Sequence, residues 1–168
     1  MGKKAQNIAL IDYGMGNLHS VSKALQRVSP EAKVLITSDA KIINTADRIV
    51  FPGVGAIGDC MTEIIRLELD SALAAAVRNK PVLAICVGMQ ALMKHSEESG
   101  GVECLGFLSG NVKRFHGEIA EGPRLKVPHM GWNEVYQTKP HALWRGIEQN
   151  SRMYFVHSYY VEVENSAL

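Results

Sequence analysis

The first half of the chain alternates short apolar runs with segments whose apolar residues recur at helical spacing. Residues 7–11 (NIALI) form such a run, and from Leu18 onward the apolar residues lie three and four apart, as on one face of a helix. Residues 32–37 (AKVLIT) and 46–51 (ADRIVF) are further runs of the first kind. The pattern predicts a strand, a glycine loop, a helix and two more strands, the last closed by the Pro-Gly-Val-Gly turn at 52–55.

The next segment predicts a helix from about residue 60 to residue 79, a strand over 81–86 (PVLAIC) and another helix that opens at Val87. An uninterrupted apolar run such as 81–86 is typical of a strand buried in a parallel sheet. Strands that alternate with helices predict an α/β fold with a doubly wound, mostly parallel sheet and flanking helices.

After His95 the pattern changes to glycine-rich turns and short alternating runs, which predict a strand-rich second half. These runs are 111–115 (NVKRF), 124–137 (RLKVPHMGWNEVYQ) and 152–164 (RMYFVHSYYVEVE). A length of 168 residues, nearly half of them apolar, predicts one globular domain over 1–168. The final run is not followed by a closing helix, so we expect this domain to be incomplete at its C-terminus.

Charge and cysteine content narrow the possible partners. Eighteen basic and seventeen acidic residues leave a formal charge of +1, so neither a nucleic acid nor a membrane is an expected partner. The three cysteines, Cys60, Cys86 and Cys104, have no paired or metal-ligand spacing, which favours a reducing, cytoplasmic setting with at least one free thiol. The apolar stretch near the N-terminus is too short for a signal peptide or a membrane span.

Cys86 lies at the predicted turn from strand to helix. In hydrolases this nucleophile elbow exposes the reactive side chain, and the backbone N–H that follows it points at the developing oxyanion. Here that donor is the N–H of Val87, and the start of a helix also favours a thiolate. The alternative is a buried core cysteine, a common place for a free thiol. The elbow context favours the nucleophile.

Two glycine loops follow the first and third predicted strands. The loop 52–55 could supply a second oxyanion donor, because loops at the carboxyl ends of parallel strands meet in one crevice. Taken alone, it is better explained as an ordinary glycine turn. The loop 14–17 (GMGN) lacks both the full G-x-G-x-x-G spacing and a Walker lysine, so we reject nucleotide binding.

Five segments, taken together, resemble a known family. They are DYGMGN at 12–17, FPGVG at 51–55, AICVGMQ at 84–90, KVPHMGWN at 126–133 and YFVHSYY at 154–160. They occur in the same order in the glutaminase subunits of imidazole glycerol phosphate synthase, a branch of the class I glutamine amidotransferases. An elbow like CVGMQ is shared by the whole class, whereas DYGMGN and PHMGWN narrow the resemblance to the histidine-biosynthesis branch.

The resemblance implies a reaction divided between two proteins. This subunit would hydrolyse L-glutamine to glutamate and ammonia, and the ammonia would pass to a (β/α)₈-barrel cyclase that makes imidazole glycerol phosphate. The two would form a heterodimer. The resemblance implies no cofactor and no metal ion, and it leaves open whether the ammonia serves histidine synthesis or a related route.

The resemblance also implies roles for individual residues. Cys86 would attack the glutamine carboxamide and form a thioester, while Gly53, Val54 and Val87 frame the oxyanion site. The amino-acid end of glutamine would be held by Gln90, His157, Ser158 and Tyr159. The segments that face the partner would include Asn17, Met130, Gly131 and Trp132. For Trp132 a core indole is an equally good interpretation, because tryptophan is usually largely buried.

A cysteine nucleophile also needs a histidine base and an acid that orients it. In the family these lie in a histidine-x-glutamate motif downstream of the segment matching YFVHSYY, and residues 161–168 contain no such motif. The six histidines present do not match it: His19, His95, His116, His129, His141 and His157. An alternative function is therefore a shortened, catalytically silent subunit that only binds a partner. A different elbow enzyme, such as a cysteine hydrolase of small esters or a peptidase-like relative, would leave KVPHMGWN unexplained.

Overall fold

The computed structural model describes residues 5–116 and 126–164. The chain divides into two compact units, which are described separately. The first comprises residues 1–113 with 161–168, and the second comprises residues 114–160. The single domain expected over 1–168 stays a prediction.

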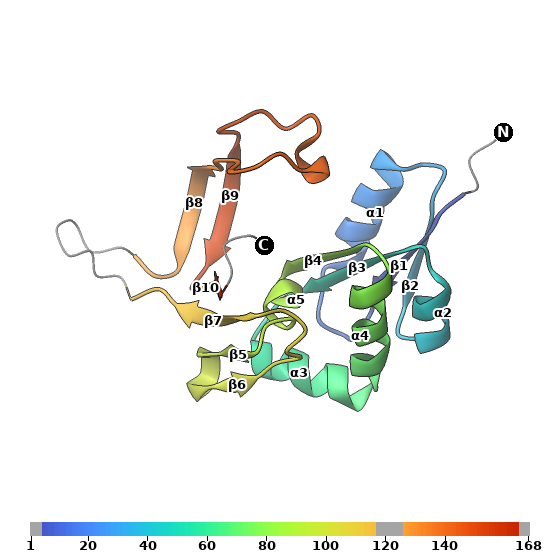
Figure 1. The fold of residues 1–168 in the computed structure, drawn as a ribbon, viewed down its shortest axis with the longest axis horizontal. Helices are drawn as coiled ribbons and strands as arrows, with labels where there is room; N and C mark the ends of the chain where they lie inside the picture. The colour runs from blue at the N-terminus through green and yellow to red at the C-terminus, as the bar shows by residue number, and fades with distance from the viewer. Residues whose placement is uncertain (1–4, 117–125, 165–168) are drawn as a thin grey trace. The chain divides into compact units, whose positions relative to one another are not determined.

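The first unit is built on a four-stranded parallel sheet with the order β2-β1-β3-β4 (Figure 1). Its strands are β1 (Asn7–Ile11), β2 (Lys33–Thr37), β3 (Arg48–Gly53) and β4 (Val82–Cys86). Each coincides with a predicted apolar run to within two residues, except that β3 continues through Pro52 and Gly53, which we expected in a turn. The central strands β1 and β3 are almost entirely buried, as a sheet covered on both faces requires.

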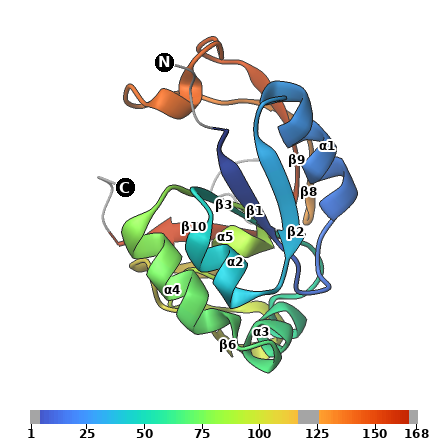
Figure 2. The ribbon, with the colours of Figure 1, turned by 90° about the vertical axis from the view of Figure 1, so that its right-hand side faces the viewer.

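Helices cover both faces of this sheet, and Figure 2 shows α1 on one side with α2 and α4 on the other. The helix α1 (Leu18–Val28) packs its apolar stripe on a cluster formed by Ile8, Leu10 and Val50. The alternate residues of the same strands face the opposite side, where α2 (Ala40–Thr45) contacts both β1 and α4. The prediction of a doubly wound sheet is therefore confirmed.

The prediction of a single helix from residue 60 to residue 79 is wrong. The segment forms two helices, α3 (Ile57–Arg66) and α4 (Leu69–Asn79). Glu68 adopts the left-handed conformation with φ of 55°, which interrupts the backbone hydrogen-bond ladder between them. The sequence also gave no expectation of α2, because six residues are too few to establish a helical period.

The chain continues into the single helical turn α5 (Val87–Gln90) and a second sheet with the order β10-β7-β5-β6. The elements of this part are β5 (His95–Ser96), the 3₁₀ turn η1 (Glu98–Gly100), β6 (Val102–Glu103), β7 (Gly110–Arg114) and β10 (Tyr159–Val163). Strands β7 and β10 carry the chain out of the first unit and back into it.

The second unit is an antiparallel ribbon of β8 (His129–Glu134) and β9 (Arg152–His157), in register from His129 opposite His157 to Glu134 opposite Arg152. The connection between these strands contains the 3₁₀ turn η2 (Ala142–Trp144). Across the described residues of the chain's second half the longer elements are all strands, so the strand-rich prediction is confirmed.

Candidate active site at Cys86

Cys86 is the last residue of β4 and the residue that precedes α5. Its backbone has φ of 54° and ψ of −120°, a conformation that a residue with a Cβ atom rarely adopts. Such strain at a turn from strand to helix is typical of a nucleophile elbow, because it lifts the side chain out of the sheet. Cys86 is exposed, so the interpretation as a buried core cysteine is excluded.

Strand β3 approaches the elbow so closely that two positions require glycine. Gly53 lies opposite Cys86 in the parallel ladder, and a Cβ atom added to it would lie 2.5 Å from the backbone nitrogen of Gly88. A Cβ atom added to Gly88 would overlap the carbonyl oxygen of Phe51. Gly53 is therefore required for close backbone packing rather than for an ordinary turn.

The residues predicted to form the oxyanion site lie next to this contact. Val87 is the first residue of α5, so its N–H has no partner within the helix. A Cβ atom on Gly53 would lie 3.0 Å from the carbonyl carbon of Val87, and Val54 follows Gly53 at the end of β3. The structure thus brings Gly53 and Val87 together beside Cys86. Their oxyanion role stays a prediction.

The short length of α5 changes one expectation about the thiol. A helix of four residues has only a small dipole, so the expected effect of a helix start on the Cys86 thiol is weak. Gln90, the last residue of α5, is buried and lies one helical turn after Cys86. Its role in glutamine binding stays a prediction.

Two side chains that the sequence analysis did not select lie behind the end of β3. The Tyr13 hydroxyl donates a hydrogen bond to the carbonyl oxygen of Pro52 at 2.8 Å, and the Cys60 thiol donates to the carbonyl oxygen of Val54 at 3.5 Å. Burial raises the pKa of the Tyr13 phenol and also that of the Cys60 thiol. Tyr13 is 39 residues from Pro52, and Cys60 is a buried residue of α3. No local sequence pattern could therefore have revealed these contacts.

The other predicted glutamine-binding residues belong to the second unit or to its boundary. His157 ends β9, and its Nδ1 atom lies 3.0 Å from the carbonyl oxygen of Tyr159. Ser158 is half-buried between the two strands, and Tyr159 begins β10. The residues predicted to hold glutamine are therefore divided between the two units.

The residues predicted to face a partner are likewise divided. Asn17 caps α1 by accepting a hydrogen bond from the Ser20 N–H. In β8, Met130 and Trp132 are 60% and 61% exposed, with Gly131 between them. The exposure of Trp132 rules out the alternative of a core indole.

Among the described residues of the first unit, no histidine nitrogen is hydrogen-bonded to the Cys86 thiol. In the second unit, His129 pairs with the Asn133 amide at 3.0 Å, and His141 Nδ1 accepts from the Leu143 N–H. The described residues thus provide the nucleophile and its surroundings without an assigned base.

Comparison with known proteins identifies the family. The sequence profile of the family described as "Glutamine amidotransferase class-I" matches residues 9–168, nearly the whole chain. The chain belongs to the class-I glutamine amidotransferase family. The prediction made from the five sequence motifs is confirmed at this level.

Curated relatives of this amidotransferase chain include proteins named "Imidazole glycerol phosphate synthase subunit HisH". The one from Pseudomonas putida is 59% identical over 157 residues, which cover 93% of this chain and 74% of the relative. The one from Dechloromonas aromatica is 57% identical over 166 residues, covering 97% and 76% respectively. The resemblance to glutaminase subunits of this synthase is thus confirmed.

A solved structure described as "Crystal structure of glutamine amidotransferase" superposes with a TM-score of 0.62 at 17% identity. The match covers 94% of this chain and 75% of that one. At this low identity the likeness concerns the fold, and it confirms the predicted fold class of this amidotransferase.

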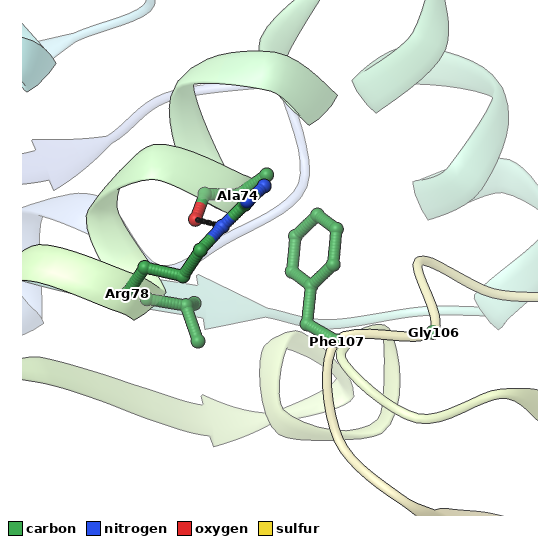
Figure 3. Close-up of a pocket in the computed structure, with 5 residues that line it drawn as sticks. Ala74, Arg78, Gly106 and Phe107 are labelled. Carbon is green, nitrogen blue, oxygen red and sulfur yellow. Dashed lines mark hydrogen bonds between the residues drawn. The ribbon is translucent and has the colours of Figure 1, made fainter.

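Two further observations concern the molecule outside the predicted site. Among the described residues, no helix is both long and apolar enough to cross a membrane. A small hollow of about 290 Å³ lies between α4 and the loop at Gly106, where Arg78 and Phe107 form its walls (Figure 3). The Arg78 Nε atom donates to the carbonyl oxygen of Ala74 there. None of the residues that line this hollow belongs to the predicted site.

Proposed function

We propose that this amidotransferase is the glutaminase subunit of an imidazole glycerol phosphate synthase and that Cys86 is its nucleophile. The observation that carries the proposal is the exposed Cys86 thiol on a strained elbow, packed against Gly53 at the end of β3. The names of the relatives from Pseudomonas putida and Dechloromonas aromatica support the choice of synthase.

The geometry of the elbow suits acyl transfer. The Cys86 sulfur attacks the side-chain amide carbon of L-glutamine, and the carbonyl oxygen acquires negative charge that the N–H groups of Val54 and Val87 stabilise. Collapse of this intermediate breaks the C–N bond and releases ammonia, which carries away the proton lost by the thiol. Water then hydrolyses the thioester to glutamate and restores the thiol.

In this proposal the remaining predicted residues bind substrate and partner. Gln90, together with the backbone of 157–159, holds the amino and carboxylate groups of glutamine. Asn17 and the exposed segment 130–132 of β8 contact a (β/α)₈-barrel cyclase in a heterodimer. The cyclase receives the ammonia and makes imidazole glycerol phosphate, and the location of both subunits is cytoplasmic.

The proposal has two forms, an active glutaminase and a silent subunit, which differ in whether the Cys86 thiol can pass on its proton. A histidine normally accepts the thiol proton and returns it to the leaving ammonia. The family places this histidine in a motif downstream of the segment at 154–160, and residues 161–168 contain no such motif. An active glutaminase and a silent, partner-binding subunit therefore differ in one measurable step.

The test is to co-purify the chain with the cyclase and to measure the release of glutamate from glutamine, together with the mass of any γ-glutamyl adduct on Cys86. We expect activity in the wild type and in Cys104→Ala, and its loss in Cys86→Ala. Cyclase binding without glutamate release would support the silent subunit instead. Absence of both binding and hydrolysis would overturn the proposed function.

A further inference from the structure

Two buried side chains, those of Tyr13 and Cys60, are hydrogen-bonded to the backbone at the end of β3. Tyr13 is 1% exposed and Cys60 is fully buried, and each donates its only polar hydrogen to a carbonyl of this segment. Burial raises the pKa of both the Tyr13 phenol and the Cys60 thiol, and the neighbouring Cys60 thiol raises the pKa of Tyr13 further. Both therefore stay protonated near neutral pH and act as neutral donors.

These two hydrogen bonds hold the backbone on either side of one peptide group, the one between Gly53 and Val54. Tyr13 binds the carbonyl of Pro52, and Cys60 binds the carbonyl of Val54. Between these two anchored peptide groups lies the Gly53–Val54 peptide, which carries the N–H of Val54. A glycine on one side of this peptide leaves its rotation poorly restricted by side-chain sterics. The two anchors limit that rotation from both ends.

A third contact places the Tyr13 hydroxyl directly against Gly53. A Cβ atom added to Gly53 would lie 2.6 Å from Tyr13 Oη, close to the backbone nitrogen of Gly88 on the elbow. The Tyr13 ring is itself held by Phe51, with ring centroids 5.5 Å apart. The hydroxyl therefore lies at the junction of β3 and the Cys86 elbow.

From this arrangement we propose that Tyr13 and Cys60 are positioning residues that hold the Gly53–Val54 peptide with its N–H ready to stabilise the oxyanion formed at Cys86. This inference rests on the proposed function. Neither side chain touches glutamine, and both act through the backbone of β3. Such preorganised donors matter because they stabilise the charge that develops during the reaction without having to reorient.

The simpler explanation is that Tyr13 and Cys60 only fill the core. A packing role depends on the size of the side chain, whereas a positioning role depends on its polar hydrogen. Tyr13→Phe removes the hydroxyl and keeps the ring. Cys60→Ala removes the thiol donor, whereas Cys60→Ser keeps a donor in a similar volume.

Two reactions of the Cys86 thiol separate these roles in the full chain. Iodoacetamide alkylates the thiol by displacement and forms no oxyanion, so its rate reports access to Cys86. The γ-semialdehyde of L-glutamate adds to the thiol as a thiohemiacetal, whose oxygen needs the same N–H donors as the reaction intermediate. Peptide masses follow the alkylation of Cys86, and the slowing of this alkylation by added aldehyde measures aldehyde binding. Neither reaction requires a histidine base.

We expect Tyr13→Phe and Cys60→Ala to weaken aldehyde binding by at least about tenfold, less than the 10²–10³ lost when an oxyanion donor itself is removed. Their alkylation rates should stay within about twofold of the wild type, which is the small change expected when access to the thiol is preserved. In the cyclase complex kcat for glutamine should fall with little change in KM. Cys60→Ser should recover most of the loss.

The matched controls are Tyr136→Phe, at a tyrosine that is 70% exposed, and Cys104→Ala, at a half-buried cysteine, and both should behave as the wild type. Equal aldehyde binding in the wild type, Tyr13→Phe and Cys60→Ala would overturn the positioning role alone. A wild-type chain that neither binds the aldehyde at Cys86 nor hydrolyses glutamine would overturn the proposed function and this inference together.

Discussion

The two units differ sharply in how much core they have. The described residues that are both hydrophobic and buried lie in the first unit, from Ile8 to Val112. Within 114–116 and 126–160, no residue is buried. The candidate nucleophile is therefore held by extensive packing, whereas residues 130–132 and 157–159, predicted to contact the cyclase and glutamine, lie in a unit whose described residues form no core. An isolated two-stranded ribbon is at best marginally stable in water.

The ribbon exposes a continuous apolar face. Met130 lies opposite Val156 and Trp132 lies opposite Tyr154, and all four side chains are more than half exposed. The rings of Trp132 and Tyr154 contact edge to face at a centroid distance of 5.5 Å. An exposed apolar patch of this kind is typical of an interaction surface, which agrees with the proposed partner contact. The comparison can be tested by equivalent substitutions in the two units.

The largest difference is expected for glycine-to-alanine substitutions. In Gly88→Ala the new methyl group overlaps the carbonyl oxygen of Phe51. Both the methyl group and this oxygen are attached to backbone, so neither can move aside as a flexible side chain would. The loss of unfolding free energy should exceed about 3 kcal/mol, the upper end for overpacked cores. In Gly131→Ala the methyl group meets nothing within 4 Å, so the change should stay within about 0.5 kcal/mol.

Urea denaturation of both variants measures this contrast. A Gly88→Ala variant as stable as Gly131→Ala would contradict the close packing of β3 on the elbow.

The next largest effect concerns a charged anchor in the first unit. The Lys80 ammonium donates to the carbonyl oxygens of Ile43, Asn44 and Ala46, where α2 ends. Lys80→Met should cost about 2–3 kcal/mol, because hydrogen bonds from a charged group are strong and those carbonyls lose their partner. Lys23→Met, on an exposed position of α1, is the control and should change stability little. Thermal unfolding distinguishes the two.

The sequence predicted the strands of the first sheet because each is a compact apolar run whose signal is local. It failed at α2 and at the break near Glu68. There, the decisive features are a short helix capped by Asp39 and one residue with positive φ. Local sequence patterns do not report either feature reliably.

For the site, too, local features could be predicted from the sequence, whereas long-range contacts could not. Cys86 could be selected because its strand and turn are adjacent in sequence. Tyr13 could not be selected, because its hydrogen-bond partner Pro52 is 39 residues away and the contact exists only after β1 and β3 pair. The residues at 157–159 and 130–132 were chosen by resemblance, and their functional roles remain predictions.

A smaller effect is expected where backbone strain differs between the units. Cys86 and Asn150 both have positive φ, of 54° and 61°. Glycine adopts such angles without strain, so Cys86→Gly should be more stable than Cys86→Ala by about 1 kcal/mol. Asparagine tolerates the left-handed region, and Asn150→Gly should therefore gain less than about 0.5 kcal/mol. Equal urea midpoints for the two Cys86 variants would show that the elbow is unstrained.

An effect of similar size, but confined to one unit, is expected for a neutral polar contact in the second unit. The Gln137 amide donates to the carbonyl oxygens of Ile147 and Glu148, and the Gln149 side chain bonds to both backbone groups of Gln137. Gln137→Ala should lose about 1 kcal/mol of local stability, as is typical of neutral hydrogen bonds.

Because the two units differ in packing, this loss should stay local. Hydrogen exchange of amides in β8 and β9 should quicken roughly fivefold, while amides in β1 and β3 keep their rates. Gln26→Ala, on an exposed position of α1, serves as the control. Faster exchange throughout the first sheet in Gln137→Ala would mean that the ribbon and the parallel sheet unfold as one cooperative unit, and the contrast between them would then not extend to stability.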